Sequence, residues 1–85
     1  MIMRLLLFGT SGCHLCEQAE SIMNECMLDG FELILEGIDI AEFDHWQTQF
    51  ALRIPVLYHP ETQQDLGWPF DHIQVKKFIS ELSHG

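Results

Sequence analysis

Residues 8–16 read FGTSGCHLC and contain two of the three cysteines of the chain. An apolar segment at 3–8 precedes it and an amphipathic segment follows it, so the two cysteines lie where a strand gives way to a helix. The first turn of a helix has unpaired backbone N–H groups and the positive end of the helix dipole, which favour thiolate over thiol at Cys13. Two intervening residues let the Cys16 sulfur reach the Cys13 sulfur. The pair can therefore close a disulfide and release a bound partner.

The segments around this junction predict a strand–helix–strand unit. Residues 3–8 are apolar at nearly every position, which is typical of a central strand covered on both faces. The following helix is expected to end near Asp29 and Gly30. Its apolar positions are Leu15, Ala19, Ile22, Met23, Cys26 and Met27. A second strand is expected at 31–38, and this order of elements implies a right-handed parallel crossover.

The second half predicts a helix, two strands and a final helix. Residues 39–52 form a short helix with Asp39 near its start as a cap, and its apolar face comprises Phe43, Trp46, Phe50 and Ala51. Strand 53–58 contains Pro55 near its start, and an antiparallel edge strand at 64–68 follows a turn. The last helix begins at Pro69-Phe70-Asp71. Its apolar face comprises Phe70, Ile73, Phe78, Ile79 and Leu82.

Size and charge restrict the function. A chain of 85 residues makes one domain, 1–85. Thirteen acidic and four basic residues give a net charge of −9, which repels nucleic acid and anionic lipid surfaces. No apolar run is long enough to span a membrane and no signal peptide is recognised, so we expect a cytoplasmic protein. Three cysteines, two of them closely spaced, fit a catalytic pair in a reducing compartment better than a secreted disulfide framework.

The chain resembles the thioredoxin superfamily in its minimal glutaredoxin form. The resemblance rests on CHLC at 13–16 and RIPVL at 53–57, and LGWPFD at 66–71 is similar to a bacterial glutaredoxin-like group. It implies an α/β fold, β-α-β-α-β-β-α, in which three helices flank a four-stranded mixed sheet. It also implies that Cys13 attacks, that Cys16 resolves, and that a cis Pro55 faces them. The backbone of Ile54 would then pair with an extended peptide or with glutathione.

The glutathione-binding pattern of glutaredoxins is only partly present. Their Gly-Gly pair corresponds here to Gly67, a bulky Trp68 and Pro69, with Asp71 following. Asp71 and the free amides at the helix entrance could hold an amino-acid end, whereas Trp68 and Phe70 suit an apolar protein surface. We predict a set of substrate-binding residues near the cysteines: Gly12, His14, Ile54, Pro55, Trp68, Phe70 and Asp71.

The sequence therefore predicts a monomeric dithiol–disulfide oxidoreductase with no metal and no bound cofactor. Its partners would be a disulfide-containing protein or glutathione, together with a reductant for its own disulfide. Two alternatives stay open: a non-catalytic binding module on the same fold, and a carrier that holds an iron–sulfur cluster with glutathione. A zinc site at Cys13 and Cys16 would need two further ligands, and the spacing of the remaining cysteine and histidines supplies none.

Several other residues have competing interpretations. His14 either stabilises the neighbouring thiolate or simply faces solvent, and Trp68 either covers the edge strand or forms a wall of the site. We expect Cys26 in the core and Arg53 in a surface salt bridge. Four histidines are expected on the surface: His45, His59, His72 and His84.

Overall fold

The structure is a computed structural model that describes residues 3–30 and 32–84. In chain order its elements are β1 (Met3–Gly9), α1 (His14–Leu28), β2 (Leu33–Asp39), the 3₁₀ helix η1 (Ile40–Glu42), α2 (Asp44–Phe50), β3 (Val56–His59), β4 (Gln64–Gly67) and α3 (His72–His84). The strands form one sheet in the order β2-β1-β3-β4. β1 pairs parallel with β2, whereas β1–β3 and β3–β4 are antiparallel. The predicted element order and mixed four-stranded sheet are confirmed.

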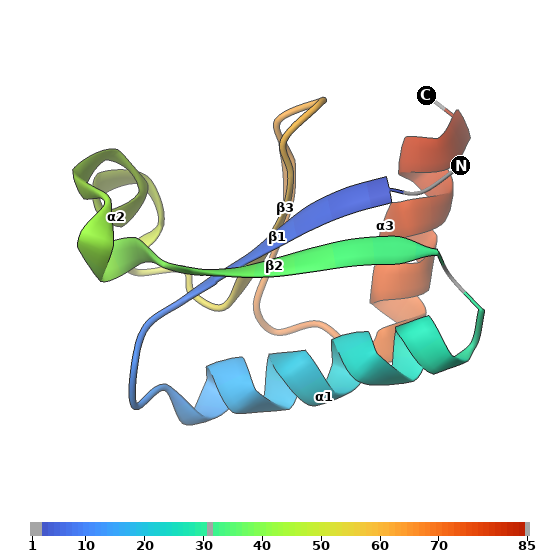
Figure 1. Ribbon diagram of the computed structural model, residues 1–85, viewed down its shortest axis with the longest axis horizontal. Helices are drawn as coiled ribbons and strands as arrows, with labels where there is room; N and C mark the ends of the chain where they lie inside the picture. The colour runs from blue at the N-terminus through green and yellow to red at the C-terminus, as the bar shows by residue number, and fades with distance from the viewer. Residues whose placement is uncertain (1–2, 31, 85) are drawn as a thin grey trace.

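β1 is the central strand and both of its faces are covered. Because side chains alternate along a strand, Leu5 and Leu7 pack on one face and Leu6 and Phe8 on the other. The first face lies against α1 and α3, and the second against η1 and α2. Figure 1 shows α1 below the strands and α2 above them, at the end where β2 finishes. The fully apolar segment therefore reflects burial from two sides.

Helix α1 buries one face against the sheet and α3. Its buried side chains are Cys16, Ala19, Met23 and Cys26. Leu15 and Met27, expected on this face, are exposed instead, because they lie at its margins near the two ends of the helix. Asp29 follows the helix, and its Oδ2 forms an ion pair with Nζ of Lys76 in α3 at 2.6 Å. This contact joins the end of α1 to α3.

The predicted helix over 39–52 is shorter and interrupted. Asp39 does act as a cap, but for η1, where its Oδ1 accepts the N–H of Ala41 at 3.0 Å. Phe43 then adopts an extended backbone (φ −133°, ψ 104°) before α2 begins. This break shifts the helical register, so Ile40 and Phe50 are buried while Phe43 is 42% exposed. Ala51 follows α2 and is exposed as well.

The β3–β4 hairpin corrects the prediction for His59. This histidine is 4% exposed, and its Nδ1 lies 2.8 Å from the hydroxyl of Thr62 in the turn. Its burial follows from its position as the last residue of a strand in which every residue is buried. β3 starts at Val56, later than predicted, because the N–H groups of Arg53 and Ile54 donate to the Phe50 carbonyl in a turn. The predicted start of the second strand at Phe31 lies outside the described residues.

α3 begins with reciprocal capping. The N–H of Gln74 donates to Asp71 Oδ1 at 2.8 Å, and the N–H of Asp71 donates to Gln74 Oε1 at 2.9 Å. Ile73, predicted to be part of the apolar face, is 66% exposed, and Val75 is buried in the core with Phe78, Ile79 and Leu82. Among the described residues, no helix has the length and apolar character needed to cross a membrane.

Candidate redox site

The site is built on the start of α1. Cys13 is the N-cap of this helix, with an extended backbone (φ −86°, ψ 106°), and its sulfur accepts the N–H of Cys16 at 3.2 Å. The two sulfurs lie at bonding distance and form a disulfide, with 5.2 Å between the Cα atoms. Cys13 is half-buried, whereas Cys16, one turn inside the helix, is 9% exposed. Cys13 is therefore the more accessible sulfur, and a backbone donor already points at it.

Two glycines shape the loop that carries the pair. Gly12 has φ +77°, a left-handed conformation that side chains rarely adopt, and it lies directly before Cys13. Gly9 ends β1 and has a different role, because a Cβ there would lie 2.8 Å from the Cys16 sulfur. The absence of a side chain at Gly9 lets the Cys16 sulfur approach the end of the central strand.

Gly9→Ala is expected to lower the free energy of unfolding by about 1–3 kcal/mol, since the new methyl group overlaps the Cys16 sulfur. Urea unfolding of the oxidised protein measures this. The matched control is Gly37→Ala in β2, because a Cβ at Gly37 meets no atom within 4 Å. Equal stability of the two variants would show that the Cys16 sulfur does not require a glycine at position 9.

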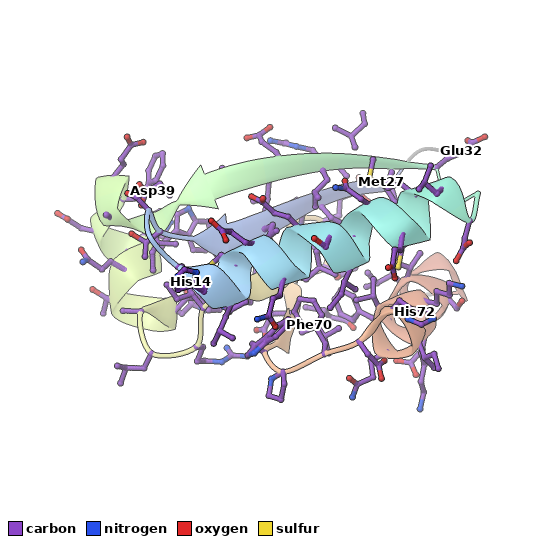
Figure 2. The ribbon with its side chains drawn as sticks, turned by 90° about the horizontal axis from the view of Figure 1, so that it is seen from below. His14, Met27, Glu32, Asp39, Phe70 and His72 are labelled. Atoms are coloured by element: carbon purple, nitrogen blue, oxygen red, sulfur yellow. A yellow bond between two sulfur atoms is a disulfide. The ribbon has the colours of Figure 1, made fainter. Side chains whose placement is uncertain are left out.

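The predicted site segments meet at one end of the sheet. In the strand register Gly9 pairs with Asp39, Phe8 with Val56, and Val56 with Gly67. Ile54 and Pro55 therefore lie beside the end of β1, and the Ile54–Pro55 bond is cis, as the resemblance implied. The N–H of Trp68 donates to the Pro55 carbonyl at 3.1 Å. Figure 2 shows His14 at the start of α1 and Asp39 at the end of β2, on the same side of the molecule.

Two of the predicted substrate-binding residues, His14 and Ile54, have neighbours that the structure defines. The His14 side chain is 92% exposed, and its Nδ1 lies 3.8 Å from the carboxylate of Glu17. The N–H of Ile54 donates within the chain to the Phe50 carbonyl at 3.2 Å. Among the hydrogen bonds of the described residues, none uses the Ile54 carbonyl. This carbonyl is the backbone group that an incoming extended segment could use.

The remaining predicted residues pack toward α3. Trp68 is half-buried, and its ring contacts the ring of Phe70 with the centroids 5.0 Å apart. Phe70 is buried in the core, and Asp71 caps α3. In Figure 2 His72, at the start of α3, lies at the opposite end of α1 from His14. Trp68 therefore covers the core while also lying beside Pro55. The substrate-binding roles of Trp68, Phe70 and Asp71 stay predictions.

Two carboxylates at the site were not recognised from the sequence. Glu20 and Asp39 line a pocket of about 170 Å³ together with Gly9, Thr10 and Cys16. The position of Glu20 has a sequence signal, because residues four apart share a helix face and Glu20 follows Cys16 by four. Asp39 reaches the pocket only through the pairing of β2 with β1.

Arg53 is the cation nearest this end of the sheet, and it is paired. Its guanidinium forms an ion pair with Asp65, as expected, and lies over the Phe50 ring with 5.4 Å to the centroid. The hydrogen bond to Asp65 raises the pKa of Arg53. Gly67 leaves room for this side chain, since a Cβ there would lie 3.1 Å from Arg53 Nη2.

Cys26 is separate from the redox pair. It is fully buried, and its sulfur lies 3.8 Å from the carbonyl of His72. Burial raises the pKa of its thiol, so it stays protonated and unreactive at neutral pH. In the part of the chain that the structure describes, no three cysteine, histidine or acidic side chains are grouped to hold a metal ion.

The sequence matches one known family over most of its length. The family described as glutaredoxin-like domain (DUF836) matches residues 4–80, which include every strand apart from Met3 of β1, and most of α3. The chain belongs to this glutaredoxin-like family. Its cysteine pair at disulfide distance fits the redox character of the thioredoxin fold. No curated protein matches the chain.

Solved structures share the glutaredoxin-like fold. The X-ray structure of protein XcR50 from X. campestris superimposes with a TM-score of 0.78 at 27% identity, covering 91% of this chain and 96% of that one. The solution structure of protein Ne2328 from Nitrosomonas europaea gives a TM-score of 0.76 at 25% identity, covering 89% of each chain. The thioredoxin-like architecture therefore extends over nearly the whole glutaredoxin-like chain.

Proposed function

We propose that this chain is a dithiol–disulfide oxidoreductase in which Cys13 is the nucleophile and Cys16 the resolving thiol. The observation that carries the proposal is the placement of the Cys13 sulfur at the helix N-cap, where it accepts a backbone N–H and bonds to the Cys16 sulfur. The N–H donor and the helix dipole stabilise a negative charge on this sulfur. A less accessible second sulfur, held within bonding reach, suits the resolving step.

The reaction consists of two thiol–disulfide exchanges. The Cys13 thiolate attacks one sulfur of the substrate disulfide, forms a mixed disulfide and expels the other substrate sulfur as a thiolate. Cys16, after losing its proton to solvent, attacks the Cys13 sulfur and expels the second substrate thiolate. The substrate is thereby reduced by two electrons and the protein is oxidised to its Cys13–Cys16 disulfide. A dithiol reductant restores the starting state by the same exchanges.

Side chains and backbone around the disulfide supply binding and electrostatics. The Ile54 carbonyl, which accepts no hydrogen bond from the described residues, can accept one from an extended substrate beside the disulfide. His14, when protonated, would stabilise the thiolate next to it, although Glu17 at 3.8 Å offsets part of that charge. The first effect positions the substrate and the second acts on Cys13, so the chemistry stays with the two sulfurs.

A turnover assay tests the proposal. The oxidised protein, a peptide disulfide and excess dithiothreitol are mixed, and peptide thiols are quantified by alkylation and mass spectrometry. We expect the protein to accelerate reduction well beyond dithiothreitol alone. Unaccelerated reduction by a folded protein whose Cys13–Cys16 disulfide forms and opens would contradict catalysis and favour the binding-module alternative.

A further inference from the structure

Three carboxylates lie near the cysteine pair, one on the first turn of α1 and two in the pocket that Cys16 lines, and we call them the acidic rim: Glu17, Glu20 and Asp39. Glu17 lies on the first turn of α1, and its carboxylate lies 3.8 Å from His14 Nδ1. Glu20 and Asp39 line the pocket that also contains Cys16. Asp39 accepts one backbone N–H, from Ala41. Among the described residues, no lysine or arginine forms an ion pair with any of the three.

The basic side chains are too few, and too well paired, to neutralise the rim. The chain has four lysines and arginines. Arg4 pairs with Glu36 at 3.3 Å, Lys76 with Asp29 at 2.6 Å, and Arg53 with Asp65. Lys77 lies on the groove between β4 and α3, together with Leu66 and Glu81. Among the described residues, the acidic rim therefore has no lysine or arginine ion-pair partner, in a chain whose net charge is −9.

Exposed apolar side chains lie close in sequence to Cys13 and to Pro55. Leu15 is exposed on α1, two residues after Cys13, and Leu52 is fully exposed two residues before the half-buried Ile54. Ile54 also presents the carbonyl that can accept a hydrogen bond from a partner backbone. A partner at this surface thus meets apolar side chains, one backbone acceptor and several carboxylates.

We infer that the disulfide partner is a protein or peptide segment with lysine or arginine beside its cysteine, and that glutathione disulfide is a poor substrate. The inference rests on the proposed function and specifies its substrate class. Positive side chains beside the substrate cysteine complement the acidic rim and accelerate encounter. Glutathione brings net negative charge from its own carboxylates, and the site offers it no unpaired lysine or arginine among the described residues.

The test compares four disulfides with one protein. Reduced full-length protein is mixed at constant pH with a large excess of symmetrical peptide disulfide whose cysteine is flanked by lysine, serine or glutamate, or with glutathione disulfide. Formation of the Cys13–Cys16 disulfide is followed by rapid acid quench, alkylation and mass spectrometry. We expect the lysine-flanked peptide to react about tenfold faster than the glutamate-flanked peptide at an ionic strength of about 10 mM. Raising the ionic strength to about 0.5 M should remove most of this ratio, because salt screens the charges.

Variants locate the effect at the rim. The double substitution Glu17→Gln and Glu20→Gln should reduce the lysine-to-glutamate rate ratio by at least about threefold at low salt. Glu25→Gln is the matched control, since Glu25 is an exposed carboxylate near the other end of the same helix. The ratio is the readout, because a change in the intrinsic reactivity of Cys13 alters the rates for all peptides together and leaves the ratio unchanged.

The outcomes separate this inference from the proposed function. A rate ratio near one at low salt, or glutathione disulfide reacting as fast as the lysine-flanked peptide, would overturn the inference while leaving the oxidoreductase proposal in place. An equal loss of preference in Glu25→Gln and in the rim variant would refute the role of the rim. Failure of every disulfide to oxidise the protein would overturn both.

Discussion

Cys13→Ser is expected to reduce disulfide turnover to the rate without protein, because serine provides no thiolate at neutral pH. Cys16→Ser should fail differently. It retains the attacking sulfur, so it should accumulate a mixed disulfide between Cys13 and one half of the substrate. The mass of the trapped adduct and the turnover rate measure the two effects separately.

Cys26→Ala is the control for these substitutions. Cys26 is fully buried away from the redox pair, so its replacement should preserve turnover per folded molecule. Strong turnover by Cys13→Ser, or a mixed disulfide that accumulates on Cys16 in Cys13→Ser and not on Cys13 in Cys16→Ser, would contradict the assigned roles.

Phe8→Ala is expected to produce the largest loss of stability, about 3–5 kcal/mol. Phe8 is fully buried on the η1–α2 face of β1, and its ring centroid lies 4.7 Å from Trp46, 5.0 Å from Phe50 and 5.3 Å from Tyr58. A domain of this size has a free energy of unfolding of only about 4–13 kcal/mol, so the loss is a large fraction of the total. Urea unfolding followed by circular dichroism gives the value.

Phe43→Ala serves as the comparison, because Phe43 is 42% exposed at the break between η1 and α2. It should cost less than about 1.5 kcal/mol, since part of its surface already contacts water. A cost for Phe43→Ala as large as that for Phe8→Ala would show that the core is not where the structure places it.

The β1–α1 junction could be predicted from sequence because several local signals coincide there. An apolar run at 3–8, a glycine, two cysteines and a helical period follow one another within 28 residues, and the observed β1 and α1 match them closely. The β3–β4 hairpin was also predictable, since Pro55 and the turn at 59–63 delimit it. The β1–α1 junction and the β3–β4 hairpin are both determined by residues close together in the sequence, so local patterns are enough to predict them.

The errors arise where burial depends on distant segments. His59 looked like a surface residue, but it ends a strand buried between its neighbours in the sheet. Phe43 fitted a helical face that the extended backbone at that residue interrupts. The cis bond at Trp68–Pro69 has no local signal that distinguishes it from a trans bond. At the site, Asp39 joins the cysteines only through strand pairing, which the sequence alone does not place in register.

We propose that the start of α1 makes the Cys13 sulfur an accessible, stabilised thiolate. The most direct test of this proposal is the pH dependence of Cys13 alkylation by iodoacetamide in the Cys16→Ser variant, resolved by mass spectrometry so that Cys26 is scored separately. We predict that labelling of Cys13 rises with a midpoint at least about one pH unit below the value of about 8.5 for an ordinary thiol. A midpoint at or above that value, or a folded protein whose Cys13 is not labelled, would contradict the account.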